Sequence, residues 1–195
     1  MRSPLSRPGP CLGFGSWVAL SVGVLCCAPD RTETLNRDSN LGLTASIRDL
    51  MDAEIDPAAD FLWASVASVS SEAGLEDRQP RTTDDWAEAR RKAITLVEAT
   101  NLLVMSGRRV STAYVPARGL GELDSTEVQK RIDAAPGAFK ALAQVLRESS
   151  LKALTAIDAR NPAELLEAGG AIDAACEACH VTFWYPEQPV TRHKR

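Results

Sequence analysis

The residues with the clearest capacity for chemistry lie near the C-terminus, in the pentapeptide Cys176-Glu177-Ala178-Cys179-His180. This is a C-x-x-C-H sequence, the pattern at which c-type haem is attached to a polypeptide. The two thiols add to the haem vinyl groups, and the neighbouring imidazole reaches the iron from one side. On a helix these three side chains are three or four residues apart, so they project from one face. The motif predicts one covalent haem c, with His180 as the proximal iron ligand.

A C-x-x-C pair also occurs in dithiol redox sites and in zinc sites. A thioredoxin-like motif opens a helix after a strand, whereas here the pair closes a long helical pattern. A structural zinc site usually has a second pair of ligands. The other cysteines, Cys11, Cys26 and Cys27, all lie in an apolar N-terminal segment, and the other histidine, His193, lies in a basic tail. The haem interpretation is therefore favoured over both alternatives.

Residues 1–28 have the pattern of an export signal or anchor. A positively charged start precedes an apolar run over residues 11–28, which is typical of a secretory signal. Covalent haem of this kind implies a compartment outside the cytoplasm, so we expect an exported, periplasmic protein. Three fates of the segment stay open. It is cleaved, it is lipidated at Cys26 or Cys27 as in a bacterial lipoprotein, or it remains as a membrane anchor, since about 18 apolar residues span a bilayer.

The net charge bears on the class of partner. The 22 basic residues less Arg2 and Arg7 leave 20 against 26 acidic ones, so the chain without residues 1–28 has a net charge of −6. Nucleic-acid-binding proteins need a basic footprint, so nucleic acid is not an expected partner. A basic redox partner suits an acidic surface, but solubility alone also explains that surface. The redox partner is therefore not identified by charge.

Four amphipathic helical stretches follow a polar linker at residues 29–42. Apolar residues recur at helical spacing over residues 43–71, 84–105, 125–159 and 161–184. These stretches are assigned to one domain at residues 43–188, and a basic tail follows at residues 189–195. The expected N-caps are Ser46, Asp124 and Asn161.

Two prolines interrupt the helical patterns. Pro57 is expected to kink or split the first helix near Asp56, because proline has no N–H to donate. Pro136, followed by glycine, is expected to break the third stretch into a short and a longer helix. Helices joined by mostly short connections indicate an all-α, antiparallel four-helix bundle with haem attached on the C-terminal helix. The pair Gly169-Gly170 in that helix is explained by close packing against a neighbour or by room for the haem plane.

A four-helix bundle with C-x-x-C-H on its last helix resembles the class II cytochromes c, the cytochrome c-prime group. The resemblance covers residues 43–185 and is most specific at the haem motif. It implies that the distal side of the haem faces a first-helix residue shortly after an arginine, and here Met51 follows Arg48. Low-spin members use methionine as the sixth ligand, whereas high-spin members leave the iron five-coordinate. Met51 is therefore the candidate distal ligand, and the family also implies a homodimer through the first two helices.

Methionine on an apolar stripe usually serves packing, so Met51 also fits an ordinary core role. Met105, at the end of the second helix, is the competing sulfur ligand. His193 is less favoured because of its place in the tail. Each of these alternatives stays open from the sequence alone.

Arginines and aromatic residues are the remaining candidates around the haem. Arg48, Arg108 and Arg109 are candidate contacts for the haem propionates, with Arg118 on the same loop as the latter two, and solvated loop arginines are the alternative. The aromatic run at residues 183–185 follows the motif directly. It either packs on the haem edge or closes the helical core, and packing is expected to dominate.

The leading functional hypothesis is a mono-haem electron carrier whose iron alternates between ferric and ferrous states. No constellation of general acid, base and nucleophile is visible, so we do not expect an enzyme. The alternative is a five-coordinate haem module that binds nitric oxide or carbon monoxide for sensing or detoxification. A structural helical protein with an accidental motif is disfavoured, because the export pattern, the motif and the helices agree with one another.

Overall fold

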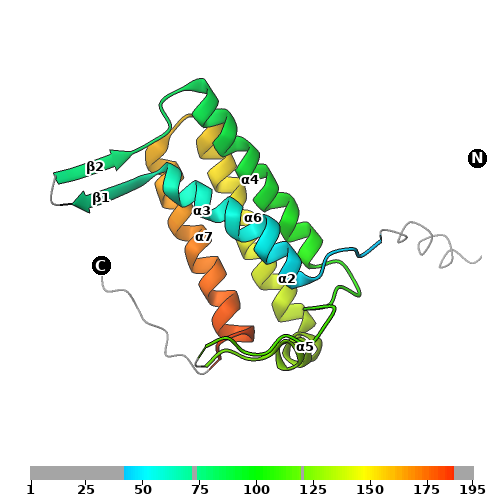
Figure 1. The fold of residues 1–195 in the computed structure, drawn as a ribbon. Coiled ribbons are helices and arrows are strands. Elements are labelled where there is room, and N and C mark those ends of the chain that lie inside the picture. Colours follow the sequence, from blue (N-terminus) through cyan, green and yellow to red (C-terminus); the bar gives the residue numbers. More distant parts are fainter. Residues whose placement is uncertain (1–41, 72–73, 120, 187–195) are drawn as a thin grey trace, which may run out of the picture. The chain divides into compact units, whose positions relative to one another are not determined.

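The computed structural model describes residues 42–71, 74–119 and 121–186. Helices dominate these residues, so the predicted all-α class is confirmed, with one two-stranded hairpin added (Figure 1). In chain order the elements are α2 (Ile47–Leu50), the π-helix η1 (Met51–Ile55), α3 (Asp56–Ser65), β1 (Ala67–Ser71), β2 (Gly74–Arg78), α4 (Thr83–Leu103), α5 (Ser125–Ala134), α6 (Pro136–Asp158) and α7 (Pro162–Phe183). The predicted export segment, its cysteines Cys26 and Cys27, the linker at 29–41 and the tail with His193 lie outside the described residues.

Three helices, α2, α5 and α7, begin at the side-chain caps that the sequence predicts. The Ser46 hydroxyl accepts from the backbone N–H of Asp49, whose carboxylate accepts in turn from the Ser46 N–H at 2.8 Å. Asp124 and Asn161 each accept from two backbone N–H groups in the first turns of α5 and α7. These contacts satisfy donors that have no partner within the helix. The start of α7 fixes the register of the haem motif at its far end.

The first predicted helix ends earlier than expected. Helical spacing predicts one element over residues 43–71, but α3 stops at Ser65 and the following residues form β1, so the prediction is wrong beyond that point. Serine and β-branched residues fill the segment after Ser65, and both types have low helix propensity. β1 pairs in antiparallel register with β2, from Ala67 opposite Arg78 to Ser71 opposite Gly74. The resulting hairpin extends away from the helices (Figure 1).

Both predicted proline interruptions are present. The N–H of Asp56 donates to the carbonyl oxygen of Met51, five residues back, which defines η1. Pro57 cannot donate to the carbonyl of Ala53 as an α-helix requires, so the π turn lies directly before it. Pro136 likewise separates α5 from α6 and occupies the first position of α6, where its missing N–H costs nothing.

The long helices bury a common apolar core. α6 packs along α4 and α7, and α3 packs on α4 and α7, with the segment from α2 to α3 crossing the others in Figure 1. Fully burying one large apolar side chain is worth about 1.5–3 kcal/mol. The largest side chains that are almost completely buried include Ile47, Ile55, Leu62, Leu96, Leu165, Ile172 and Phe183. This core holds the C-terminal half of α7 against η1 and α6.

The two glycines of α7 have different surroundings. The indole N–H of Trp63 donates to the carbonyl oxygen of Gly169 at 3.0 Å, and a Cβ at Gly169 would lie 3.3 Å from a Trp63 ring carbon. A Cβ at Gly170 would meet no atom within 4 Å. Both glycines line an outer hollow beside Trp63, not the hollow next to the haem motif. Close packing against a neighbouring helix therefore explains Gly169.

Gly170→Ala is expected to stabilise the fold by about 0.5–1 kcal/mol, because alanine loses less backbone entropy in a helix than glycine. Gly169→Ala is the matched control, since its added methyl group must displace the Trp63 ring. Urea unfolding followed by circular dichroism measures both changes. A gain at Gly169 as large as that at Gly170 would contradict the packing described here.

Candidate haem site

The three motif side chains lie together on the last turns of α7. Cys176, Cys179 and His180 are each half-buried and line one small cavity of about 20 Å³. Apolar side chains from η1, α4 and α6 complete its walls, among them Ile55, Leu103, Phe139, Leu142 and Leu146. The surface of the cavity is almost entirely apolar. Such surroundings exclude water from whatever the three side chains hold.

Met51 lines the same cavity from the opposite element, η1. The structure therefore brings together the predicted proximal residue, His180, and the predicted distal residue. Met105 lies elsewhere, with its sulfur accepting from the guanidinium of Arg108 at 3.3 Å. Of the two methionines weighed from the sequence, only Met51 faces the motif.

Burial disfavours the thiolate form of both cysteines. Desolvation raises the pKa of Cys176 to about 12, and the carboxylates of Asp56 and Asp173 add to the rise. Desolvation also raises the pKa of Cys179 to about 11. Dithiol redox sites instead have a thiol with a lowered pKa in a positively charged environment. The structure therefore favours a binding role for these cysteines over a dithiol redox role.

The burial of His180 favours the neutral form of its ring. Desolvation lowers the pKa of His180, while the carboxylates of Asp56 and Glu177 oppose this effect. A neutral imidazole has a free lone pair, which is the form that binds a metal. Among the described residues, no group of three or more His, Cys, Asp or Glu side chains could hold a bare metal ion. The zinc alternative thus gains no support from this part of the chain.

Alkylation of the haem-free protein is expected to accelerate about tenfold per pH unit from pH 8 to pH 10. The raised pKa values leave both thiols protonated in that range, and only the thiolate reacts. Iodoacetamide labelling followed by peptide mass spectrometry isolates Cys176 and Cys179 from the N-terminal cysteines. The urea-unfolded chain should instead reach a plateau near pH 9–10, above an ordinary thiol pKa of ~8.5. A plateau at that pH in the folded protein would contradict the burial.

Aromatic rings surround the imidazole and close the end of the core. The rings of Trp184 and Tyr185 lie 6.0 and 5.8 Å from that of His180, measured between centroids. Phe183 is 1% exposed and meets Phe139 edge-on at 5.5 Å. Phe183 therefore serves the core, whereas its two neighbours flank the candidate iron ligand. The predicted core role is thus present at Phe183, and packing of the run on a haem edge stays a prediction.

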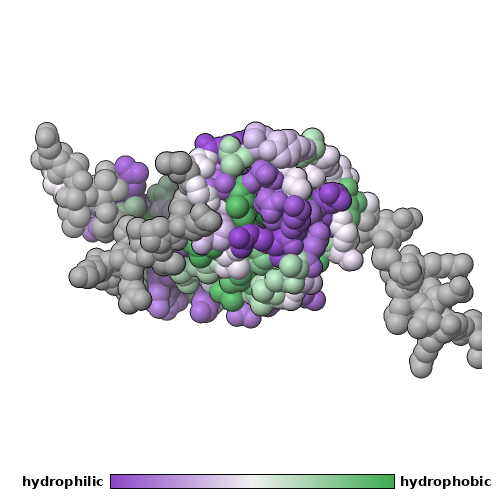
Figure 2. Space-filling view, turned by 90° about the horizontal axis from the view of Figure 1, so that it is seen from below, coloured by the Kyte–Doolittle hydropathy of each residue, from purple (hydrophilic) through white to green (hydrophobic). Residues whose placement is uncertain are grey.

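A second, polar hollow of about 260 Å³ adjoins the cavity, and Met51, Asp56 and His180 line both. Arg48 and Arg118 also line it. Figure 2 shows the molecule from below, with hydrophilic residues over much of the middle of this face and hydrophobic ones in smaller patches. Three carboxylates line the same hollow, and the Arg48 guanidinium pairs with one of them, that of Asp52, at 3.7 Å, so the hollow has charges of both signs.

The other two predicted propionate contacts do not line either hollow. The Arg108 guanidinium donates to the carbonyl oxygen of Leu102 at 2.6 Å and to that of Ala45. It therefore caps the C-terminal end of α4. The carbonyl oxygen of Arg109 accepts from the N–H of Ile47 at 2.8 Å, which fixes the loop to the start of α2.

Asp56 is the site residue that the sequence analysis did not single out. It lies five residues after Met51, which in an α-helix places the two about 140° apart around the axis. The π turn removes this separation, so both line the same hollows. A π turn has no reliable sequence signal, although a proline directly after Asp56 is compatible with one.

The donor set fits an iron porphyrin, but the cavity must widen to accept one. Two thiols and an imidazole on α7 face a thioether on η1, which is the ligand set of a six-coordinate c-type haem. A space of about 20 Å³ holds roughly one water molecule. Binding therefore requires the walls of the cavity to move apart.

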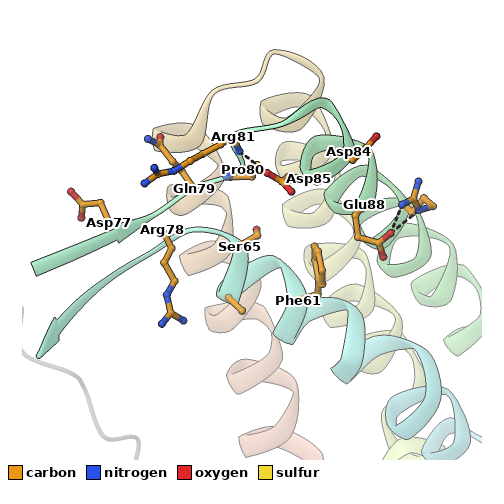
Figure 3. Close-up of a pocket in the computed structure, with 12 residues that line it drawn as sticks. Phe61, Ser65, Asp77, Arg78, Gln79, Pro80, Arg81, Asp84, Asp85 and Glu88 are labelled. Carbon is orange, nitrogen blue, oxygen red and sulfur yellow. Dashed lines mark hydrogen bonds and ion pairs between the residues drawn. The ribbon is translucent and has the colours of Figure 1, made fainter.

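A larger hollow, of about 820 Å³, lies where α3 ends and β2 leads into α4 (Figure 3). Its charged side chains have both signs: Asp77, Arg78, Arg81, Asp84, Asp85, Glu88 and Arg91. Asp85 accepts from backbone N–H groups at the start of α4, and Arg91 pairs with Glu88. No cysteine, histidine or methionine is among the residues that line it. Its interactions therefore serve the start of α4 and not the haem motif.

Comparison with known proteins gives no family assignment. No protein-family model, curated protein or solved structure matches this chain. Among the described residues, no helix is both long and apolar enough to cross a membrane. The class of protein therefore has to be argued from the site itself.

Proposed function

We propose that this chain is an exported mono-haem c-type cytochrome of the class II type that transfers electrons. In this proposal α3, α4, α6 and α7 form an antiparallel four-helix bundle, with haem c attached on α7. The supporting observation is that Met51 and the three motif residues line one apolar cavity. This shared cavity is more specific evidence for a haem site than either the C-x-x-C-H motif alone or a methionine on an apolar stripe alone.

When bound, the haem supplies a one-electron couple between ferric and ferrous iron. Cys176 and Cys179 hold it through thioether bonds, so the cofactor does not dissociate. His180 would supply a ring nitrogen to the iron, with the rings of Trp184 and Tyr185 beside its imidazole. Met51 would supply the thioether ligand, and the apolar walls would exclude water. A methionine ligand and burial both favour the ferrous state and raise the reduction potential.

The location follows from the cofactor chemistry. Attachment of haem c requires a compartment outside the cytoplasm, so we assign the chain to the periplasm, with Cys26 or Cys27 as the site of a lipid anchor in the lipoprotein alternative. Mass spectrometry of the mature N-terminus distinguishes cleavage, lipidation and retention of residues 1–28.

Co-expression with a haem-attachment system tests the proposal. The purified protein should retain haem on a denaturing gel, and its oxidised spectrum should be low-spin at neutral pH. A high-spin spectrum that shifts on addition of nitric oxide would instead support the five-coordinate, ligand-binding alternative. Colourless protein from a host that matures a control cytochrome would overturn both.

A further inference from the structure

The carboxylate of Asp56 is the leading charge that acts on the haem-attachment residues. It ranks ahead of Asp173 in its effect on Cys176 and ahead of Glu177 in its effect on His180. It also lines both the apolar cavity and the polar hollow. Its side chain is exposed at their rim. Asp56 is thus the acidic residue that lines the apolar cavity together with Cys176 and His180.

The π turn gives Asp56 this position. The hydrogen bond from its N–H to the Met51 carbonyl oxygen places it one full turn from the candidate distal ligand, on the same face. Pro57 favours the turn because it cannot donate to Ala53. The geometry therefore couples the carboxylate to the residue that faces the iron. A regular α-helix would direct the two side chains apart.

We propose that Asp56 lowers the reduction potential of the haem iron through its negative charge. This inference rests on the proposed function. A fixed negative charge beside a partly desolvated iron stabilises the more positive ferric state. Asp56 then opposes the increase in potential that burial and a Met51 ligand produce. The chain would set its working potential by the balance of these effects.

Asp60 provides a matched control. It lies four residues further along α3, is exposed like Asp56, and interacts with Asp56. It is not among the charges that act on Cys176 or His180. Asp60→Asn therefore removes one negative charge from the same helix, at a position that does not act on the C-x-x-C-H residues.

The test is a redox titration of the holoprotein and of its Asp56→Asn and Asp60→Asn variants. Asp56→Asn is expected to shift the ferric-to-ferrous equilibrium about tenfold towards ferrous, a rise of ~59 mV for one electron. Asp60→Asn is expected to produce a clearly smaller rise. The oxidised spectra of all three proteins should be the same, because Asp56 acts through its charge and does not bind the iron.

Equal potentials for the two variants, or no change in either, would overturn the inference. A change of spin state in Asp56→Asn alone would also overturn it, because Asp56 would then bind the iron or hold Met51 in place. Haem staining of the same samples separates these failures from that of the proposed function. If the parent protein and both variants retain covalent haem, only the role of Asp56 fails. If the parent protein has none, the proposed function and this inference fail together.

Discussion

Replacing Cys176 and Cys179 together by alanine is expected to leave the chain without any covalently attached porphyrin. Cys176 and Cys179 are the only cysteines among the described residues, and both line the cavity together with His180. Alanine is the best helix former, so α7 should persist and the loss should be one of attachment and not of folding. Haem staining after denaturing electrophoresis measures the loss, and circular dichroism verifies the helix content.

Three further variants make this experiment more specific. Each single cysteine variant should retain one thioether bond, so its haem should stay on the gel with a shifted pyridine haemochrome band. Thr182→Ala is the matched control on the same helix, since its hydroxyl donates to the Ala178 carbonyl oxygen and its side chain is exposed. It should keep full staining. Undiminished staining of the double variant would place the attachment elsewhere in the chain.

The helix starts were predictable because the signals are local. Ser46, Asp124 and Asn161 each accept from N–H groups within three residues. Such a contact depends only on neighbouring residues, so the sequence alone predicts it. The break at Pro136 is equally local, since it follows from a missing N–H. The haem motif needed only the regular spacing of α7 to place its three side chains on one face.

The features that were missed depend on partners distant in sequence or on a rare turn. The end of α3 at Ser65 was not predictable from apolar spacing. Residues 67–71 form backbone hydrogen bonds with β2 in place of helical ones, and this pairing depends on a second strand. The position of Asp56 beside the cavity was not predicted, because regular α-helical geometry would direct its side chain away from Met51. The acceptors of the Arg108 side chain, at the end of α4 and before α2, likewise have no local signal in the sequence.

Replacing Met51 by alanine is expected to abolish the sulfur-to-iron charge-transfer band of the oxidised protein. Met51 is the methionine whose side chain lines the cavity with His180. In the proposed site, loss of this thioether would remove the sixth ligand and leave the iron high-spin. The reduction potential should fall, because a methionine ligand favours ferrous iron. Optical spectra of the oxidised protein and a redox titration measure the two effects.

Met105→Ala is the control, because it removes the same side chain from a place where the sulfur accepts from Arg108. It should leave the band and the potential unchanged. If the band survives in the Met51 variant and disappears in the Met105 variant, Met105 is the sulfur ligand and Met51 is not. The end of α4 would then have to rearrange on haem binding. If the parent protein itself lacks the band and binds carbon monoxide, Met51 is a packing residue. The open iron position beside it would then favour the ligand-binding function over electron transfer.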